Sequence, residues 1–313
     1  MKALQCTELG GPEKLQVNEI DAPEAMPGHV VIDVKSGSIN FPDVLMIQGL
    51  YQFQPPLPFI PGGASAGVIS DVGEGVTKFK EGNKVFAMTG VGAFAEKILA
   101  AESNCMPIPE SMDFDSAAAL SMTYGTSLYA LKQRASLQPG ETLLVLGASG
   151  GVGLAAIELG KAMGAKVIAA ASTQDKIDMC LSHGADEGFI YPSSNLDRDQ
   201  QKELSNKIKE LTGGLGPNVI YDPVGGSYAE PCLRSIAWEG RYLVIGFAAG
   251  ADQIPKMPLN LTLLKGCQIV GVFWGAWVGQ FPDENKKNFD ELFNLHSEGK
   301  INPEVSQKYS LED

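Results

Sequence analysis

Residues 147–153 have the composition of a phosphate-binding turn. Glycine permits a sharp turn and brings backbone N–H groups close to an anion at a helix N-terminus. The dinucleotide fingerprint G-x-G-x-x-G falls on residues 148–153, with Ala148 at its first glycine position. The alternative is a glycine turn that only permits close helix packing. The residues expected to hold the cofactor here are Ser149, Gly150, Gly151, Val152 and Gly153.

The flanking segments predict the strand and helix that must position this turn. Residues 143–146 are an unbroken apolar run, which is typical of a parallel strand covered on both faces. Residues 154–163 carry only two charged side chains, Glu158 and Lys161, and predict a helix packed along most of its surface. Residues 166–171 predict a second strand. The three segments complete a βαβ unit, which is the context that supports dinucleotide binding.

The end of the second predicted strand indicates which dinucleotide is bound. A site for NAD places Asp or Glu there to bond the ribose 2′-hydroxyl. This chain has Ala170, Ala171 and Ser172 instead, and Lys176 follows. The missing carboxylate and the available ammonium favour a 2′-phosphate, so we predict that Ser172 and Lys176 bind NADPH. The alternative for Lys176 is an ordinary surface lysine at a helix start.

Composition and charge narrow the class of protein. The chain has 313 residues, of which 44% are hydrophobic and 19% charged, and this suits about two domains with large cores. A formal net charge of -13 would repel nucleic acid and anionic lipid, so neither is an expected partner. The five cysteines are scattered, which argues against a disulfide framework or a zinc cluster. Residues 1–20 contain no uninterrupted apolar core of signal-peptide length, and no later segment approaches the ~18 consecutive apolar residues of a membrane span, so we predict a cytoplasmic protein.

The first third of the chain predicts a compact antiparallel domain. Short β-like runs separated by Gly and Pro turns occur at residues 1–6, 29–36, 66–72, 84–88 and 93–100. Two helical patterns follow at residues 117–122 and 126–134.

Strand and helix patterns then alternate beyond the second strand. Helices are predicted at residues 174–183, 204–211 and 285–297, and strands at 189–191, 218–222, 241–247 and 268–274. This alternation predicts an α/β fold built on a doubly wound parallel sheet.

Several motifs together carry a resemblance to a known family. They are Gly-Ser-Ile-Asn-Phe-Pro-Asp at 37–43, Leu-Pro-Phe-Ile-Pro-Gly-Gly at 57–63, Val-Gly-Glu-Gly-Val at 72–76, the glycine turn, Asp-Pro-Val-Gly-Gly at 222–226 and Val-Gly-Val-Phe-Trp-Gly-Ala-Trp at 270–277. Over nearly its whole length the chain resembles the zinc-independent quinone oxidoreductases of the medium-chain dehydrogenase/reductase superfamily. The resemblance implies a Rossmann domain at residues 123–274. It also implies a mainly β, barrel-like (GroES-like) catalytic domain, formed by residues 1–122 with 275–313, and an active site in the cleft between the two.

Departures from the zinc-containing relatives concern the metal ligands. Asn40 and Gly63 stand where those relatives have Cys and His, and only Cys105 lies in the region of their four-cysteine lobe. Because zinc needs three or four N, S or O ligands, we expect no metal site.

Two other departures do not concern a metal. Ala64 replaces a Glu found in many relatives. Family members usually continue past the position of Asp313 through another helix and a strand.

The resemblance implies hydride transfer from NADPH to a small-molecule electron acceptor, a quinone or an α,β-unsaturated carbonyl. By similarity Asn40 and Tyr51 are the catalytic residues. Asn40 would hydrogen-bond the ribose or carboxamide, and Tyr51 would donate to the acceptor oxygen or line its ring site. The alternatives are a turn residue for Asn40 and a half-buried loop aromatic for Tyr51.

The resemblance also adds cofactor contacts beyond the turn. Thr126 would reach the nicotinamide, with a helix cap as the alternative, and Tyr191 would pack near the adenosine, with a core tyrosine as the alternative. Gly246 and Phe247 end a strand on the ligand side of the sheet. Phe273 and Trp274 would form a wall of the nicotinamide pocket, or else core or dimer contacts.

The sequence also bears on the oligomeric state and on two alternative functions. An apolar edge strand at residues 268–273 predicts a homodimer. A metal-dependent alcohol dehydrogenase is disfavoured by the missing Cys and His ligands, and a non-catalytic NADPH-binding structural or regulatory protein stays open. The sequence does not identify the acceptor.

Overall fold

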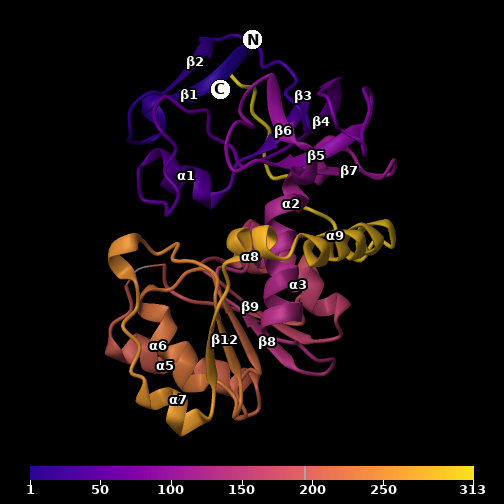
Figure 1. The fold of residues 1–313 in the computed structure, drawn as a ribbon. Helices are drawn as coiled ribbons and strands as arrows, with labels where there is room; N and C mark the ends of the chain where they lie inside the picture. The colour runs from indigo at the N-terminus through magenta and orange to yellow at the C-terminus, as the bar shows by residue number, and fades with distance from the viewer. Residues whose placement is uncertain (194) are drawn as a thin grey trace. The chain divides into compact units, whose positions relative to one another are not determined.

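The structure is a computed structural model that describes residues 1–193 and 195–313 (Figure 1). The chain forms two compact units. Unit 1 comprises Met1–Met122 and Pro303–Asp313, and unit 2 comprises Thr123–Asn302. The C-terminal segment belongs to unit 1 because it is tied there by ion pairs of Lys2 with Glu312 and of Lys308 with Asp115.

Unit 1 is built on antiparallel strands. A five-stranded sheet has the order β6-β3-β4-β5-β7, and a hairpin pairs β1 with β2. The strands are β1 (Lys2–Cys6), β2 (Leu15–Glu19), β3 (His29–Ser38), β4 (Ala64–Val72), β5 (Lys84–Met88), β6 (Lys97–Ala101) and β7 (Cys105–Pro107). The centre of β3 is buried because it pairs on both sides, with β4 and with β6. This confirms the predicted antiparallel domain, although β6 begins four residues later than expected.

Helix α1 (Phe41–Ile47) follows β3 in unit 1. Its apolar residues Met46 and Ile47 pack against Cys6 and Phe59, and these four side chains form one buried cluster. Helix α1 was not predicted from the sequence, because a seven-residue helix carries too few apolar repeats to show a helical period.

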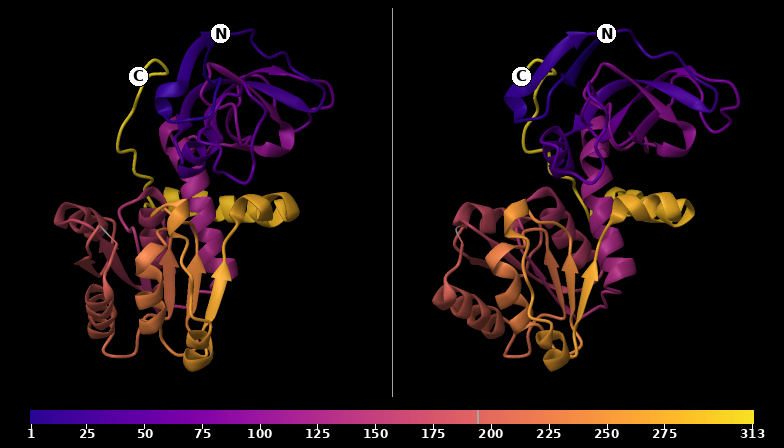
Figure 2. Two further views of the ribbon diagram at one scale, coloured as in Figure 1. Left: turned by 90° about the vertical axis from the view of Figure 1, so that its left-hand side faces the viewer. Right: turned by 60° about the vertical axis from the view of Figure 1, so that its left-hand side comes forward.

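Unit 2 contains a six-stranded parallel sheet of the order β10-β9-β8-β11-β12-β13 within the described residues. The strands are β8 (Thr142–Val145), β9 (Lys166–Ala171), β10 (Glu187–Ile190), β11 (Val219–Asp222), β12 (Arg241–Val244) and β13 (Gln268–Gly271). The strands pair in parallel, and the orange strand arrows of this unit point upward in both views of Figure 2. The order confirms the predicted doubly wound α/β fold.

Helices connect and cover the strands of unit 2. They are α3 (Gly151–Ala162), α4 (Gln174–Ser182), α5 (Arg198–Leu211), α6 (Ala229–Ser235), α7 (Asn260–Lys265), α8 (Trp274–Gln280) and α9 (Pro282–Ser297). Helices α5 and α6 lie together on one face of the sheet and α3 on the other (Figure 1). Leu204 and Ile208 of α5 and Leu233 of α6 share a buried core with Leu144 and Ile220 of the strands. No helix among these or the other described residues is long and apolar enough to cross a membrane.

Residues 275–302, which were expected in the catalytic domain, cluster with unit 2. They belong to unit 2 because α8 and α9 pack there through aromatic contacts. The rings of Trp277 and Tyr129 stack with their centroids 4.5 Å apart, and those of Trp274 and Phe289 lie 6.3 Å apart. The sixth strand is accordingly shorter than predicted, because it ends at Gly271 and Trp274 already begins α8.

The helical patterns at residues 117–122 and 126–134 form one continuous helical run. Helix α2 (Phe114–Leu128) passes directly into a π-helical turn at Tyr129–Arg134. Gly125, which separates the two patterns in the sequence, does not end the helix. It lies against the indole of Trp274, where a Cβ would come within 2.5 Å of a ring carbon.

Candidate functional site

The glycine turn joins β8 to α3 in unit 2. Gly147 has a φ of 54°, a left-handed conformation that favours glycine, and Gly150 precedes the first residue of α3. Gly153 is buried, and a Cβ there would lie 2.6 Å from the carbonyl oxygens of both Gly147 and Ala148. A side chain at 153 is therefore excluded by the close approach of the helix to the turn.

The exposed part of the turn has the geometry of an anion site. Gly150 and Gly151 are exposed, and Ser149 and Val152 are half-buried. The N–H groups of the first turn of an α-helix have no carbonyl partner four residues earlier in the helix, and they carry the positive end of the helix dipole. These predicted cofactor residues thus lie together at the N-terminus of α3, where a phosphate would accept their hydrogen bonds.

Tyr191 supports the turn from the core of unit 2. The Gly147 N–H donates to the Tyr191 hydroxyl oxygen at 3.1 Å, and the ring lies 4.8 Å from that of Tyr228. Burial raises the pKa of Tyr191 to about 12, so the hydroxyl is neutral at physiological pH. Tyr191 belongs to the buried core cluster, in line with the core-tyrosine alternative. Its contact with an adenosine stays a prediction.

The end of β9 brings the two residues predicted to select the cofactor into contact. The Lys176 ammonium donates to the Ser172 hydroxyl oxygen at 3.1 Å. Lys176 is exposed and Ser172 is half-buried, whereas Ala170 and Ala171 are buried. The Thr173 hydroxyl caps α4 and holds the backbone between the two residues. A hydroxyl and an ammonium therefore lie where a site for NAD would present a carboxylate.

Asp222, which the sequence analysis did not assign to the site, ends β11 beside β8. Its carboxylate accepts N–H bonds from Val224 and Gly225, both at 2.8 Å, and a bond from the Tyr242 hydroxyl. Burial raises the pKa of this carboxyl group. The local feature of the sequence that could have identified Asp222 is an acid at the end of an apolar strand and before proline. Asp222 holds the loop of residues 223–226, against which Phe247 packs at Gly225.

Four further predicted cofactor residues occupy different environments in unit 2. Gly246 and Phe247 are half-buried just beyond the carboxyl end of β12. Phe273 is 56% exposed, whereas Trp274 is only 6% exposed and bonds the Asn285 side chain through its indole N–H at 3.3 Å. Phe273 is accessible to a ligand and Trp274 is a core residue of unit 2. A nicotinamide contact of either ring stays a prediction.

Thr126 lies inside α2 and is half-buried. The helix-cap alternative for Thr126 is wrong, because α2 continues to Leu128 and then into the π-helical turn. Its role as a cofactor contact stays a prediction.

Asn40 lies in unit 1 between β3 and α1. Its side-chain amide donates to the carbonyl oxygen of Ser38 at 3.1 Å and to the Ser38 hydroxyl at 2.9 Å. Its backbone N–H donates to the Asp43 carboxylate at 2.8 Å. These bonds hold Asn40 at the turn, as its structural alternative proposed, and leave the side chain half-buried. A contact with the cofactor stays a prediction.

Asp43 organises this part of unit 1, and the sequence analysis did not single it out. Its side chain is buried, with 4% of its surface exposed, and it also accepts backbone hydrogen bonds from Gly62 and Gly63. Burial raises the pKa of Asp43 to about 6, against the lowering effect of these N–H donors. The local feature of the sequence that could have identified Asp43 is a carboxylate three residues after an Asn N-cap. Asp43 joins α1 to the loop that precedes β4.

Tyr51 lies near this carboxylate. Its ring packs on the cluster that contains Met46 and Phe59, and the residue is half-buried. Burial, followed by the negative charge of Asp43, raises the pKa of the Tyr51 hydroxyl. At neutral pH Tyr51 is therefore a protonated hydrogen-bond donor.

The positions of zinc ligands in relatives carry other side chains here. Asn40 and Gly63 provide no thiolate or imidazole, and Cys105 is buried with its thiol pKa raised to about 12 by burial. Within residues 1–193 and 195–313, no group of three or more His, Cys, Asp or Glu side chains is arranged to hold a metal ion.

Two family models match the chain. The alcohol dehydrogenase GroES-like domain matches residues 26–110, and the zinc-binding dehydrogenase domain matches residues 151–293. The first match lies in unit 1 and the second in unit 2.

Individual relatives match almost the entire chain. It is 37% identical over 314 residues to the quinone oxidoreductase-like protein 2 homolog of Nematostella vectensis, covering 99% of this chain and 83% of the relative. A probable oxidoreductase from Mycobacterium abscessus has a structure with a TM-score of 0.84 at 37% identity, covering 98% of this chain and 90% of that one. Escherichia coli quinone oxidoreductase, solved in complex with NADPH, has a TM-score of 0.87 at 29% identity and covers 98% and 91%. The chain therefore belongs to the quinone oxidoreductase family of the medium-chain dehydrogenase/reductase superfamily, and is an oxidoreductase of that family.

Proposed function

We propose that this protein is an NADPH-dependent reductase that transfers hydride to a quinone or an α,β-unsaturated carbonyl without zinc. The observation that carries the proposal is the contact of Lys176 with Ser172 at the end of β9, where no carboxylate is present. The NADPH complex of the Escherichia coli homologue supports this assignment. The quinone specificity is supported by the names of the relatives.

The residues present fit NADPH. The N-terminus of α3 offers backbone N–H groups to the diphosphate, and exposed Gly150 and Gly151 leave room for it. Ser172 and Lys176 would hold the 2′-phosphate through a hydroxyl and an ammonium. When bound, NADPH supplies the hydride.

The side chains of unit 1 would act on the acceptor. Tyr51 keeps its proton at neutral pH, so its hydroxyl would donate a hydrogen bond to the acceptor oxygen as negative charge develops there. Asp43 acts through Asn40, because the bond from the Asn40 N–H to the Asp43 carboxylate fixes the start of α1. Asn40 would orient the cofactor through its side-chain oxygen, while its amide nitrogen bonds Ser38.

Zinc independence rests on the side chains that are present. A catalytic zinc site needs three protein ligands, commonly Cys, His or a carboxylate. Asn40 and Gly63 stand at two of the ligand positions of zinc-dependent relatives, and neither residue supplies a thiolate or an imidazole. Stoichiometric zinc in the purified protein would contradict this part of the proposal.

The test of the cofactor assignment is Lys176→Ala, with Lys207→Ala as a control that removes an exposed lysine from α5. A charge-assisted hydrogen bond to a phosphate contributes about 1.5–3 kcal/mol, so the variant should bind NADPH roughly 10- to 100-fold more weakly. NADH lacks the 2′-phosphate, and its dissociation constant should hardly change. Fluorescence titration with both cofactors at low salt measures the two constants.

Other outcomes of this titration, and of a turnover assay, would contradict parts of the proposal. Equal weakening of both cofactors would show that Lys176 supports the fold rather than the phosphate. A wild type that prefers NADH would overturn the NADPH assignment. Tight NADPH binding without turnover across a panel of quinones and enones would favour a non-catalytic NADPH-binding protein.

We also propose a homodimer in the cytoplasm. Strand β13 is the outer strand of its sheet, and Ile269 on it is 38% exposed, so pairing across a two-fold axis would extend the sheet. The five cysteines are free and buried, as suits a reducing compartment. Light scattering at micromolar concentration should give twice the chain mass, and a monomer mass would contradict the dimer.

A further inference from the structure

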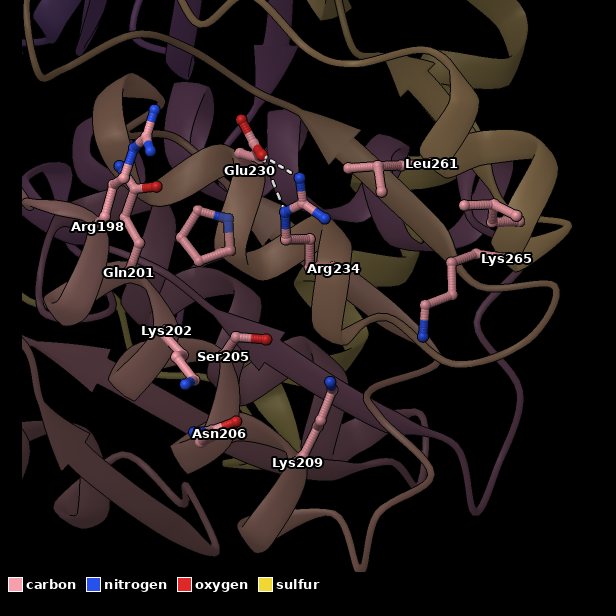
Figure 3. Close-up of a pocket in the computed structure, with 12 residues that line it drawn as sticks. Arg198, Gln201, Lys202, Ser205, Asn206, Lys209, Glu230, Arg234, Leu261 and Lys265 are labelled. Atoms are coloured by element: carbon pink, nitrogen blue, oxygen red, sulfur yellow. Dashed lines mark hydrogen bonds and ion pairs between the residues drawn. The ribbon is translucent and has the colours of Figure 1, made fainter.

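A cavity of about 820 Å³ lies between α5, α6 and α7 of unit 2 (Figure 3). Its lining has one carboxylate, Glu230, and several cationic side chains, although the chain as a whole has a net charge of -13. The cations are Arg198, Lys202, Lys209, Arg234 and Lys265. The cavity is therefore a local positive site on an acidic protein.

Four of these cations, Arg198, Lys202, Lys209 and Lys265, form no salt bridge with the residues that the structure describes. Glu230 is paired with Arg234, whose Nε and Nη2 donate to the same carboxylate oxygen at 2.9 and 2.6 Å. Among the four, Lys209 and Lys265 are only partly exposed. Their ammonium groups point toward one another in Figure 3. An anion bound among the cations of the lining would gain a favourable interaction with each of them.

The cavity also contains a hydroxyl without a hydrogen-bond partner in the described part of the chain. Ser205 of α5 lines the cavity, and only 7% of its surface is exposed. Other helical serines bond a carbonyl of the preceding turn, as Ser121 does with Ala118 at 2.8 Å. Over the residues that the structure describes, the Ser205 hydroxyl makes no such bond. The Ser205 hydroxyl is therefore available to donate a hydrogen bond to an acceptor in the cavity.

The chemistry of the lining identifies the class of ligand. The ammonium and guanidinium groups and the hydroxyl all donate hydrogen bonds, so the ligand must be a polyanion rich in acceptor oxygens. The net charge of the chain repels nucleic acid and anionic membranes, while the size of the cavity suits a small molecule. We propose that this cavity binds a small molecule that carries two or more phosphate groups.

The cavity is separate from the proposed dinucleotide site. Lys265 ends α7 shortly before β13 begins, near the amino ends of the parallel strands. The glycine turn instead follows the carboxyl end of β8. The proposal does not depend on the identity of the cofactor.

The test measures the binding of inorganic pyrophosphate by isothermal titration calorimetry at low salt. Lys209→Gln/Lys265→Gln removes the two lining ammonium groups that are only partly exposed and should weaken binding by at least about 10-fold. Lys207→Gln/Lys286→Gln makes the same change in charge at two exposed lysines outside the cavity. This control should stay within about twofold of the wild type, because only long-range charge changes. Lys265→Gln alone serves if the double variant fails to fold.

Two more variants locate the binding. Ser205→Ala should weaken pyrophosphate about 2- to 10-fold, as expected for one neutral hydrogen bond, and should leave the far-UV circular dichroism unchanged. Lys176→Ala should leave pyrophosphate binding unchanged, which separates this cavity from the NADPH assignment. Equal binding by the wild type and the Lys209→Gln/Lys265→Gln variant would overturn the proposal, as would wild-type protein that binds no pyrophosphate at millimolar concentration.

Discussion

Two junctions of this protein lead from a strand into a helix and are stabilised in opposite ways. In unit 2 the turn from β8 to α3 is held by backbone contacts, and Gly153 approaches two carbonyl oxygens with no space for a side chain. In unit 1 the junction from β3 to α1 is held by a buried carboxylate, Asp43. We therefore expect added side-chain volume to change the stability of the first junction, and a change in the charge of Asp43 to change the stability of the second.

The largest expected effect is the pH dependence of Asp43. Its pKa is raised from 3.8 to about 6 by burial, so between pH 4 and pH 6 the folded chain keeps a proton that the unfolded chain has lost. The contribution of Asp43 to the free energy of unfolding therefore falls as the pH rises through this window, by about 3 kcal/mol in total. Above pH 7 it is constant.

Asp43→Asn removes this titration. The stability of the wild type relative to the variant should therefore decrease by about 2 kcal/mol from pH 4 to pH 7, because part of the total change already occurs below pH 4. Urea denaturation at pH 4, 5, 6 and 7 measures it, with Asp71→Asn as a control at an exposed position of unit 1. A difference between wild type and Asp43→Asn that does not change with pH would show that the carboxylate is not held in this way.

The next effect is steric and belongs to the turn of unit 2. Gly153→Ala places a Cβ 2.6 Å from the carbonyl oxygens of Gly147 and Ala148, so the backbone must shift. We expect a loss of about 1–3 kcal/mol in the free energy of unfolding, as for other overpacked sites, and much weaker NADPH binding.

Gly150→Ala is the matched control for this prediction. Gly150 has a φ of -79°, and the nearest atom to an added Cβ is the Gly147 oxygen at 3.4 Å. The stability of this variant should change little. If both variants have the same melting temperature, the close approach at Gly153 does not constrain the turn.

The smallest effect concerns the hydroxyl of Tyr51. Tyr51→Phe keeps the ring packed on Met46 and Phe59 and removes only the proposed donor to the acceptor. We expect turnover to fall about tenfold, or ~1.4 kcal/mol, while the NADPH dissociation constant stays the same. Steady-state kinetics with one fixed quinone and a separate binding titration measure the two quantities. An unchanged turnover would leave Tyr51 as a lining residue.

The sequence predicted the turn of unit 2 well and the Asp43 junction poorly, for a physical reason. A glycine turn between an apolar strand and a helix is encoded in consecutive residues, and so is the Ser172–Lys176 pair, four residues apart at the start of a helix. The donors to Asp43 come from Asn40 and from Gly62 and Gly63, two segments that only the folded sheet brings together.

The contrast between local patterns and contacts of distant segments also explains two further features that the sequence did not predict. Helices α8 and α9 belong to unit 2 because of ring contacts with distant residues, such as Trp277 with Tyr129. The phosphate cavity depends on Lys209 and Lys265, which lie on different helices and show no pattern in the sequence.

The sequence by itself determined the six strands of unit 2 in their chain order, the position of the glycine turn and the absence of an acid at the end of β9, whereas helices α6, α7 and α8 were not predicted. These features follow from local periodicity and from the steric limits of single residues. Only the tertiary structure decided that Tyr191 and Trp274 are core residues and that Asp43 has a raised pKa. Burial and electrostatic environment are properties of all the segments packed around a residue, and no local stretch of sequence contains them.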